Sequence, residues 1–239
     1  MPAVFVHGVP DTPALWSPLI DYLDRDDIVL PQLPGFGTGV PNGFDATKEA
    51  YVDWLAAQIE AVGEPVDLVG HDWGSLLVQR VASTRPDLIR TWAAGAATVD
   101  PAYAWHEMAT MWQTPDVGEQ VMAAVTPEAM AVALAPEMGE DRANAVSEFV
   151  DATMKDCILK LYRSAVNVGQ EWGPAVDKME RPGLVLWGRD DPFVTSNFGE
   201  RLAQRTGAQL VMFDGTGHWW PVTRAEEAAG HLTEFWASA

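Results

Sequence analysis

The stretch Val66–Gly74, VDLVGHDWG, contains the most informative feature of this chain. Its first four residues, Val66–Val69, form a mostly apolar run that is typical of a buried strand, and a helical pattern follows it. The residues between them, Gly70–Gly74, have the G-x-D-x-G form of a nucleophile elbow with Asp72 at the centre. The two glycines permit a sharp turn, and such a turn presents the Asp72 side chain to a substrate.

An aspartate at this position restricts the chemistry. A carboxylate that attacks an ester or amide carbonyl gives an unfavourable anhydride, whereas attack on a saturated carbon with a leaving group gives an ordinary ester. Water can then hydrolyse that ester at its carbonyl carbon. The expected electrophile is therefore an sp3 carbon that carries a halide or an epoxide oxygen. The expected intermediate is an alkyl ester of Asp72.

The composition is that of one α/β domain. The chain has 239 residues, 48% of them hydrophobic, which is enough for a large core, and its net charge of −19 disfavours nucleic acid and anionic membranes as partners. The single cysteine, Cys157, excludes an intrachain disulfide and favours a reducing compartment. The N-terminal sequence lacks the features of a signal peptide, and no segment approaches the ~20 uninterrupted apolar residues of a membrane span. We expect a soluble, cytoplasmic protein, either a monomer or a homodimer.

Strand and helix patterns alternate along most of the chain, which predicts a mostly parallel sheet with helices on both faces. The alternation stops between residues 99 and 179, where the sequence is rich in Ala and Met and has helical character. This block is too long for one loop, so we expect a helical cap at 99–179 inserted between core segments 1–98 and 180–239. The expected strands are Val4–His7, Ile28–Leu30, Val66–Val69, Ile89–Ala94, Gly183–Trp187 and Gln209–Phe213. The expected helices of the core are Ala14–Leu23, Thr47–Val62, Trp73–Ser83, Phe198–Arg205 and Ala225–Trp236.

An Asp nucleophile needs a base that activates water, a carboxylate that orients this base, and an oxyanion hole. The candidate base is His218, in a Gly-rich loop after the last expected strand. The candidate orienting acid is Asp191, which follows the preceding strand, and Asp190 and Asp100 remain alternatives.

The oxyanion hole should consist of two backbone N–H groups. Trp73 supplies one because it directly follows the nucleophile. Val9 is the expected second donor, since it lies in the motif His7–Pro10 and Pro10 has no N–H to give. Ser75 lies outside the elbow, where a capping or packing role is expected.

The cap contains many Met and Trp side chains, which suit an apolar, adaptable pocket wall as well as a core. We expect Trp105, Met111 and Trp112 from the cap, with Trp219 beside the candidate base, to line a substrate pocket. No metal-ligand spacing and no phosphate-binding loop occurs, so we expect no metal and no cofactor. The expected partner is a small hydrophobic molecule.

These motifs together resemble the α/β-hydrolase superfamily, specifically its Asp-nucleophile branch. That branch includes epoxide hydrolases, haloalkane dehalogenases and fluoroacetate dehalogenases. The resemblance covers essentially the whole chain and follows the family order from His7-Gly8-Val9-Pro10 and the elbow to Trp187-Gly188, Asp191 and Gly217-His218-Trp219. It implies the α/β-hydrolase fold with an inserted helical cap. Because the chain starts on the strand of the His-Gly motif, the N-terminal strands are shortened and about six strands are expected.

Tyr162-Arg163, near the end of the cap, resembles the Tyr-Arg pair of epoxide hydrolases, in which the tyrosine protonates the epoxide oxygen. The second cap tyrosine of that family would fall near Met111, and Tyr103 is a possible replacement. The resemblance therefore favours an epoxide hydrolase in which Tyr162 is a fourth catalytic residue.

A haloalkane dehalogenase is the alternative, with Trp73 and a cap tryptophan, Trp105 or Trp112, as halide donors. Val9 departs from that pattern because it stands where those enzymes often have Asn. Fluoroacetate dehalogenases carry an Arg at the position of Trp73, which makes that reaction a weak match. A third reading is a binding module or a hydrolase for another substrate, since a fold does not fix a function.

Overall fold

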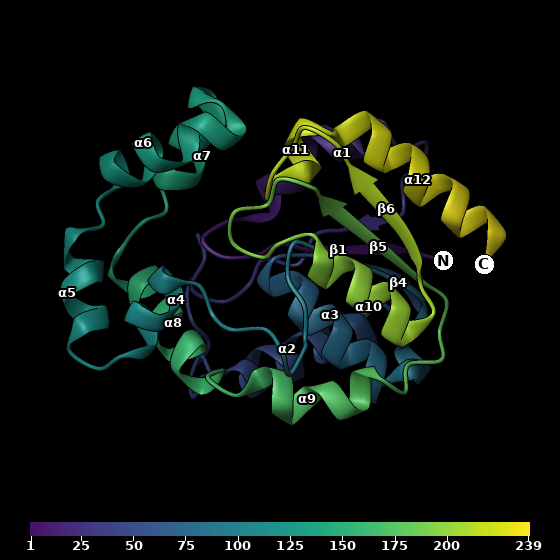
Figure 1. Cartoon of the computed structure of the whole chain (residues 1–239), viewed down its shortest axis with the longest axis horizontal. Helices are drawn as coiled ribbons and strands as arrows, with labels where there is room; N and C mark the ends of the chain where they lie inside the picture. Colours follow the sequence, from purple (N-terminus) through teal and green to yellow (C-terminus); the bar gives the residue numbers. More distant parts are fainter.

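The computed structural model covers all 239 residues and contains one six-stranded sheet in the order β2-β1-β3-β4-β5-β6 (Figure 1). All neighbouring strands are parallel. The strands are β1 (Ala3–Val6), β2 (Ile28–Val29), β3 (Val66–His71), β4 (Ile89–Gly95), β5 (Gly183–Gly188) and β6 (Gln209–Phe213). The predicted class, a parallel sheet flanked by helices, is confirmed.

Helices cover both faces of the sheet, so its central strands are apolar on both sides. In β1, Val4 and Val6 enter one hydrophobic core while Ala3 and Phe5 enter the other, as the alternation of a strand requires. The first core lies under α2 (Lys48–Glu60), α3 (Trp73–Thr84) and α10 (Asn197–Thr206). The second lies under α1 (Ser17–Ile20), α11 (Trp220–Thr223) and α12 (Ala225–Ser238).

The turn between β3 and α3 is as sharp as its glycines suggest. Asp72 has φ 53° and ψ −123°, a conformation that is strained for any residue other than glycine. A Cβ on Gly74 would lie 2.1 Å from the Val6 carbonyl oxygen, and one on Gly70 would lie 2.3 Å from the Gly74 oxygen. The glycines are needed because β1, β3 and α3 approach closely at this point.

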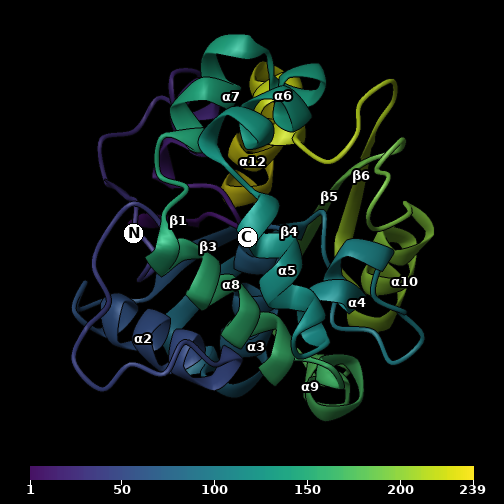
Figure 2. The ribbon, with the colours of Figure 1, turned by 90° about the vertical axis from the view of Figure 1, so that its left-hand side faces the viewer.

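Six helices lie between β4 and β5, within the block that we propose as the cap, residues 99–179. Figures 1 and 2 show α4 to α8 beyond the end of the sheet, with α6 and α7 arching away from α8. The last of them, α9, packs against α3 and so rests on the core. The six are α4 (Glu107–Gln113), α5 (Val117–Ala124), α6 (Pro127–Met138), α7 (Glu140–Ser147), α8 (Ala152–Ser164) and α9 (Val168–Val176).

One predicted helix differs from the structure. The expected helix Ala14–Leu23 is a short 3-10 turn followed by the single turn α1, because Pro18 lacks the N–H that a continuous helix needs. The edge strand β2 has only two residues, and Pro31 follows shortly after it. The short helix α11 was not expected. The other predicted bounds agree with the structure to within two residues.

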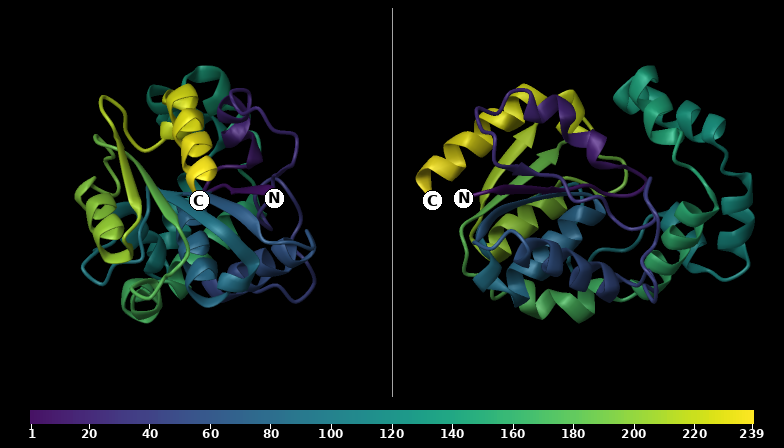
Figure 3. Two further views of the ribbon diagram at one scale, coloured as in Figure 1. Left: turned by 90° about the vertical axis from the view of Figure 1, so that its right-hand side faces the viewer. Right: turned by 180° about the vertical axis from the view of Figure 1, so that it is seen from behind.

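The two chain ends lie close together, on the side of the molecule away from the cap (Figures 1 and 3). No single helix has the length and apolar character needed to cross a membrane. The pair α5 and α6 meets that criterion only together, with an 83° bend between its halves.

Candidate active site

The candidate residues of the core gather at the carboxyl ends of the parallel strands. Val9 follows β1, Asp72 follows β3, Asp191 follows β5 and His218 follows β6. The chain leaves β1 toward β2 and returns to β3 on the opposite side, so the ends of β1 and β3 flank a switch in strand order. Ligands of open parallel sheets bind at such a switch point.

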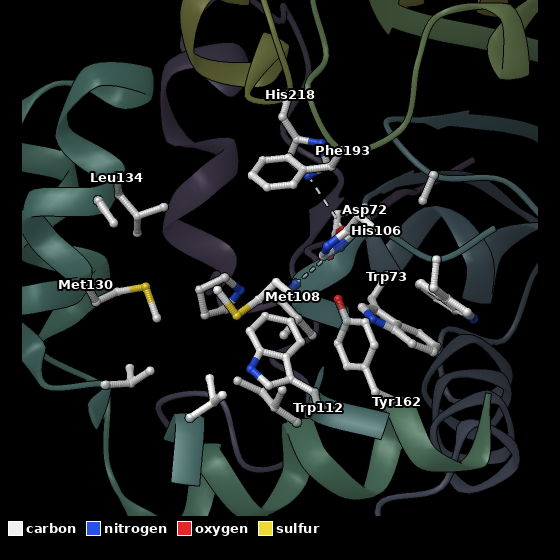
Figure 4. A pocket seen from close by; sticks show the side chains of 18 of the residues that line it. Asp72, Trp73, His106, Met108, Trp112, Met130, Leu134, Tyr162, Phe193 and His218 are labelled. Atoms are coloured by element: carbon white, nitrogen blue, oxygen red, sulfur yellow. Dashed lines mark hydrogen bonds and ion pairs between the residues drawn. The ribbon is translucent and has the colours of Figure 1, made fainter. Parts of the chain in front are cut away.

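The structure brings Asp72, His218 and Asp191 into one hydrogen-bonded row. His218 Nε2 lies 3.5 Å from Asp72 Oδ2, and His218 Nδ1 lies 2.9 Å from Asp191 Oδ2. The other oxygen of Asp191 accepts hydrogen bonds from the backbone N–H groups of Phe193 and Val194, each at 2.9 Å. Figure 4 shows His218 directed at Asp72 from the β6 side of the pocket. The imidazole is therefore held from behind, with its second nitrogen facing the nucleophile candidate.

The two alternative acids lie elsewhere. Asp100 is buried and binds the guanidinium of Arg201 at 2.8 and 3.0 Å, and Arg205 Nη1 is 3.3 Å away. Asp190 is exposed on the loop after β5. Asp191 is thus the carboxylate that orients His218.

Electrostatics favour ionised carboxylates around a protonated imidazole. Burial by itself lowers the pKa of His218, but the charges of Asp191 and Asp72 outweigh it and raise this pKa to about 10. Burial likewise raises the pKa of Asp72, and the hydrogen bond with His218 outweighs it and holds the pKa below its usual value. In the resting site Asp72 is a carboxylate and His218 an imidazolium.

The two oxygens of Asp72 have different surroundings. Oδ1 accepts a 2.7 Å hydrogen bond from the Val9 N–H, while Oδ2 faces His218. Trp73 is the first residue of α3, so its backbone N–H has no acceptor within the helix and is free to donate near Asp72 Oδ1. A Cβ on Gly8 would lie 2.4 Å from the Asp72 side chain, which explains the glycine beside Val9.

Two other histidines of the motifs have structural roles. His7 Nε2 accepts the Leu33 N–H at 3.0 Å, and His71 Nε2 lies 2.8 Å from the His218 carbonyl oxygen. Burial lowers the pKa of each to about 4, so both are neutral at physiological pH. Ser75 is buried and donates to the Ala97 carbonyl at 2.7 Å, consistent with its expected packing role.

A cavity of about 530 Å³ lies between the elbow and the cap, and 23 of its 30 lining residues are hydrophobic. Trp105, Trp112 and Trp219 line it, as predicted from the sequence. Met111 does not, and Met108 takes its place. Met108 and Trp112 are one turn apart and share a face of α4, whereas Met111 is displaced by ~100° around the helix from Trp112.

Polar donors from the cap and from α3 lie at this cavity. Tyr162 is buried, its ring lies edge-on to Trp73 at 5.3 Å between ring centroids, and its hydroxyl is directed toward Asp72 in Figure 4. Burial, followed by the charge of Asp72, raises the pKa of Tyr162 well above its usual value, so the phenol keeps its proton. The indole nitrogens of Trp73 and Trp112 are buried without a partner, whereas Trp105 Nε1 donates to the Ala165 carbonyl at 3.2 Å.

Tyr103, the possible second tyrosine, also lines the cavity. Its hydroxyl donates a long hydrogen bond, 3.5 Å, to the Phe193 carbonyl oxygen. Tyr162 is thus the tyrosine whose hydroxyl is directed toward Asp72 in Figure 4, whereas the Tyr103 hydroxyl is engaged by Phe193.

The structure also adds lining residues that sequence reasoning missed, among them His106, Phe193, Glu137 and Lys155. The Phe193 ring lies between His218 and His106, at 5.1 and 5.4 Å between ring centroids. His106 caps α4 by accepting the Ala109 N–H at Nδ1. The N-cap position of His106 is the only feature that the sequence could indicate, and an N-cap position does not reveal which way the ring faces.

Asp11 is a buried carboxyl next to the site. Its Oδ2 accepts the Trp219 indole N–H at 3.1 Å, while Oδ1 has no partner. Burial raises the pKa of Asp11 to about 7, with a further contribution from the charge of Asp72. This carboxyl holds the Trp219 wall of the pocket in place.

No group of three or more His, Cys, Asp or Glu side chains is arranged to hold a metal ion. The polar groups that line the cavity include Asp72, His218, the Tyr162 hydroxyl, His106, Glu137 and Lys155.

A parallel sheet with an acid–histidine–acid row at its carboxyl edge, beneath inserted helices, defines a hydrolase of the α/β class. A family model described as "Alpha/beta hydrolase family" matches residues 3–230, and the chain belongs to this family. It is thus an enzyme of the α/β-hydrolase superfamily.

Relatives within the family carry out different reactions. The chain is 26% identical over 220 residues to an (E)-2-((N-methylformamido)methylene)succinate hydrolase of Acinetobacter baylyi, covering 88% of this chain and 81% of the relative. It is also 26% identical over 215 residues to a haloalkane dehalogenase of Mycolicibacterium paratuberculosis, covering 81% and 68%. Among solved structures, an esterase of Thermogutta terrifontis matches with a TM-score of 0.82 at 20% identity, covering 100% of this chain and 90% of that one. The last likeness shows the fold alone.

Proposed function

We propose that this hydrolase forms an alkyl ester on Asp72 and that it opens epoxides to vicinal diols. The observation that carries the proposal is the position of the Tyr162 hydroxyl, directed at Asp72 from the opposite wall of an apolar pocket (Figure 4). An epoxide bound between them has its carbon next to the carboxylate and its oxygen next to a proton donor. The substrate class that fits such a pocket is a small hydrophobic molecule.

In the first step Asp72 Oδ2 attacks an epoxide carbon and the carbon–oxygen bond breaks. The alkoxide takes the Tyr162 proton, and the indole N–H of Trp73 is a second donor at the same place. The proton of the His218 imidazolium then restores the phenol, which leaves His218 neutral. Ester formation also removes the charge of Asp72, one of the two charges that raise the pKa of His218.

In the second step neutral His218 removes a proton from a water molecule that attacks Cγ of the ester. Negative charge develops on Oδ1, where the Val9 N–H already donates in the resting site and the Trp73 N–H lies free. Collapse of this intermediate releases the diol and returns the Asp72 carboxylate and the His218 imidazolium. Asp191 stabilises the positive charge that His218 gains during the attack.

A haloalkane dehalogenase is the second candidate, and one observation favours it. The indole nitrogens of Trp73 and Trp112 are buried at the pocket without partners, as halide donors would be. In Figure 4, however, the Trp112 nitrogen faces the wall of Met130 and is turned away from Trp73. Trp105, the other expected donor, is committed to the Ala165 carbonyl. These positions make the pair Tyr162 and Trp73 the better match for a leaving oxygen.

A third candidate, a binding module or a hydrolase for another substrate, predicts that Asp72→Asn leaves ligand binding intact while no alkyl ester ever forms. The relatives include an (E)-2-((N-methylformamido)methylene)succinate hydrolase as well as a haloalkane dehalogenase, which is why a hydrolase for another substrate is a separate candidate.

The substitution Tyr162→Phe tests the proposal. We expect it to lower kcat/KM for epoxides by ~10²–10⁴, the usual contribution of a positioned acid, and to leave release of halide from haloalkanes within a few-fold of wild type. Tyr103→Phe is the matched control, because the Tyr103 hydroxyl is hydrogen-bonded to the Phe193 carbonyl, and it should lower neither rate. An unchanged rate of epoxide opening in Tyr162→Phe would refute the assignment of the acid.

A further inference from the structure

Among the 30 residues that line the cavity, Lys155 is the only lysine or arginine. Its side chain is half-buried on α8, and no carboxylate lies within ion-pair distance of it. Two nearby acids are otherwise engaged: Asp151 caps α8 through the Met154 N–H, and Asp156 pairs with Lys160. The pocket wall therefore holds a positive charge without a partner in the protein.

Lys155 has a fixed relation to the catalytic end of the pocket. Lys155, Ile158 and Tyr162 line the same cavity from one face of α8. Tyr162 lies seven residues after Lys155, which is two turns, or ~10 Å along the helix axis. The wall between the cation and the proton donor is apolar.

A second charge makes the pocket asymmetric. Glu137 on α6 also lines the cavity, and its Oε2 lies 3.2 Å from the position that a Cβ on Gly217 would take, next to the His218 loop. Asp72 and Glu137 thus place negative charge at the end of the pocket next to the His218 loop, where the His218 imidazolium lies beside Asp72, whereas Lys155 places an unpaired positive charge on the α8 wall. Lys155 is therefore the cation of the pocket that is free to attract an anionic ligand.

We propose that the substrate is an apolar carboxylate whose carboxyl group pairs with Lys155 while its reactive carbon lies at Asp72, past the apolar stretch of α8 that separates Lys155 from Tyr162. The reactive carbon depends on the proposed function, whereas the carboxylate subsite does not. The net charge of −19 repels anions at long range, so binding of an anionic ligand needs the local attraction of a cation inside the pocket. Because the Lys155 side chain is half-buried beside apolar residues, the pair is stronger than a fully exposed ion pair.

Binding of decanoate, an unreactive straight-chain carboxylate, tests the subsite without any chemistry. We expect Lys155→Gln to weaken decanoate binding about tenfold or more, measured by calorimetry, and to leave binding of 1-decanol unchanged. Lys160→Gln is the matched control on the same helix, since Lys160 is exposed, paired with Asp156 and absent from the cavity wall. The inference would be overturned if Lys155→Gln weakened the binding of both ligands equally, or if it left the affinity for decanoate unchanged.

A second readout separates this inference from the proposed function. If wild type hydrolyses long-chain epoxides, those with a terminal carboxylate should show a higher kcat/KM than their methyl esters, and Lys155→Gln should remove the difference. Charge-selective binding of decanoate without any epoxide turnover would support the subsite and contradict the epoxide reaction. Turnover of carboxylate and ester at equal rates in wild type would contradict the subsite alone.

Discussion

The two oxygens of Asp72 are held in different surroundings, which suits the two successive reactions that we propose for this residue. Its strained backbone places the carboxylate at the end of β3, where one oxygen lies on the Val9 N–H and the other faces His218. In the mechanism that we propose, the first oxygen becomes the carbonyl oxygen of the ester and the second attacks carbon. The Val9 N–H that holds the resting carboxylate would then also stabilise the oxyanion of the second step.

At the same scale, the two buried aspartates Asp191 and Asp100 should respond very differently to substitution by Asn. Asp191→Asn removes the acceptor that orients and charges His218, and we expect kcat to fall by ~10³–10⁴. Asp100→Asn weakens its bonds to Arg201, so it should lower the free energy of unfolding by about 1–3 kcal/mol and retain most activity. Steady-state rates and denaturant unfolding of both variants measure this contrast. Comparable losses of activity would show that Asp191 is not the orienting acid.

Asp11 makes stability depend on pH. The pKa of this carboxyl is raised to about 7 in the folded protein, so the native state keeps the proton up to a higher pH than the unfolded chain. The free energy of unfolding contributed by Asp11 therefore falls as pH rises from about 4 to about 7. Asp11→Asn retains an acceptor for Trp219 and lacks this titration. We expect the variant to be more stable relative to wild type at pH 8 than at pH 5, and an equal difference at both pH values would contradict the prediction.

At the scale of elements, the elbow depends on close contact between two strands and one helix. Gly74→Ala would place a methyl group 2.1 Å from the Val6 carbonyl oxygen, a backbone atom that cannot turn aside. We expect a loss of at least ~1–3 kcal/mol in unfolding free energy, or failure to fold, together with loss of activity. Gly230→Ala on α12 is the control: nothing lies within 4 Å of its Cβ, so it should be neutral or stabilise by up to about 1 kcal/mol. Thermal unfolding of the two variants checks the difference.

Most elements could be predicted from the sequence because hydrophobic runs and breakers mark them directly. The six strands follow from short apolar segments, and the helix after the elbow follows from its 3.6-residue period. The prediction of a helix at Ala14–Leu23 was wrong. Pro18 interrupts the backbone hydrogen bonding of a continuous helix, and an apolar pattern does not reveal this interruption.

At the scale of the whole molecule, the order of the motifs was enough to predict the sheet and the meeting of Asp72, His218 and Asp191. In a parallel sheet, residues that follow successive strands arrive at one edge. No such rule applies to the cap. Met108 lines the pocket and Met111 does not, because of the side of α4 that faces the pocket, and the sequence does not indicate that side. The commitment of Trp105 to Ala165 and the position of Lys155 depend on tertiary packing in the same way.

The central claim is that Asp72 becomes an alkyl ester that His218 then helps to hydrolyse. Intact-protein mass spectrometry of the variant His218→Gln, after exposure to terminal epoxides and, separately, to haloalkanes, tests it most directly. We predict that the variant forms the ester and cannot hydrolyse it, so its mass should rise by that of one whole epoxide and peptide mapping should place the gain on Asp72. A gain equal to an alkyl group without its halogen, seen with haloalkanes alone, would support the dehalogenase instead. No adduct from either class, in a variant that has lost turnover, would contradict the claim that Asp72 is the nucleophile.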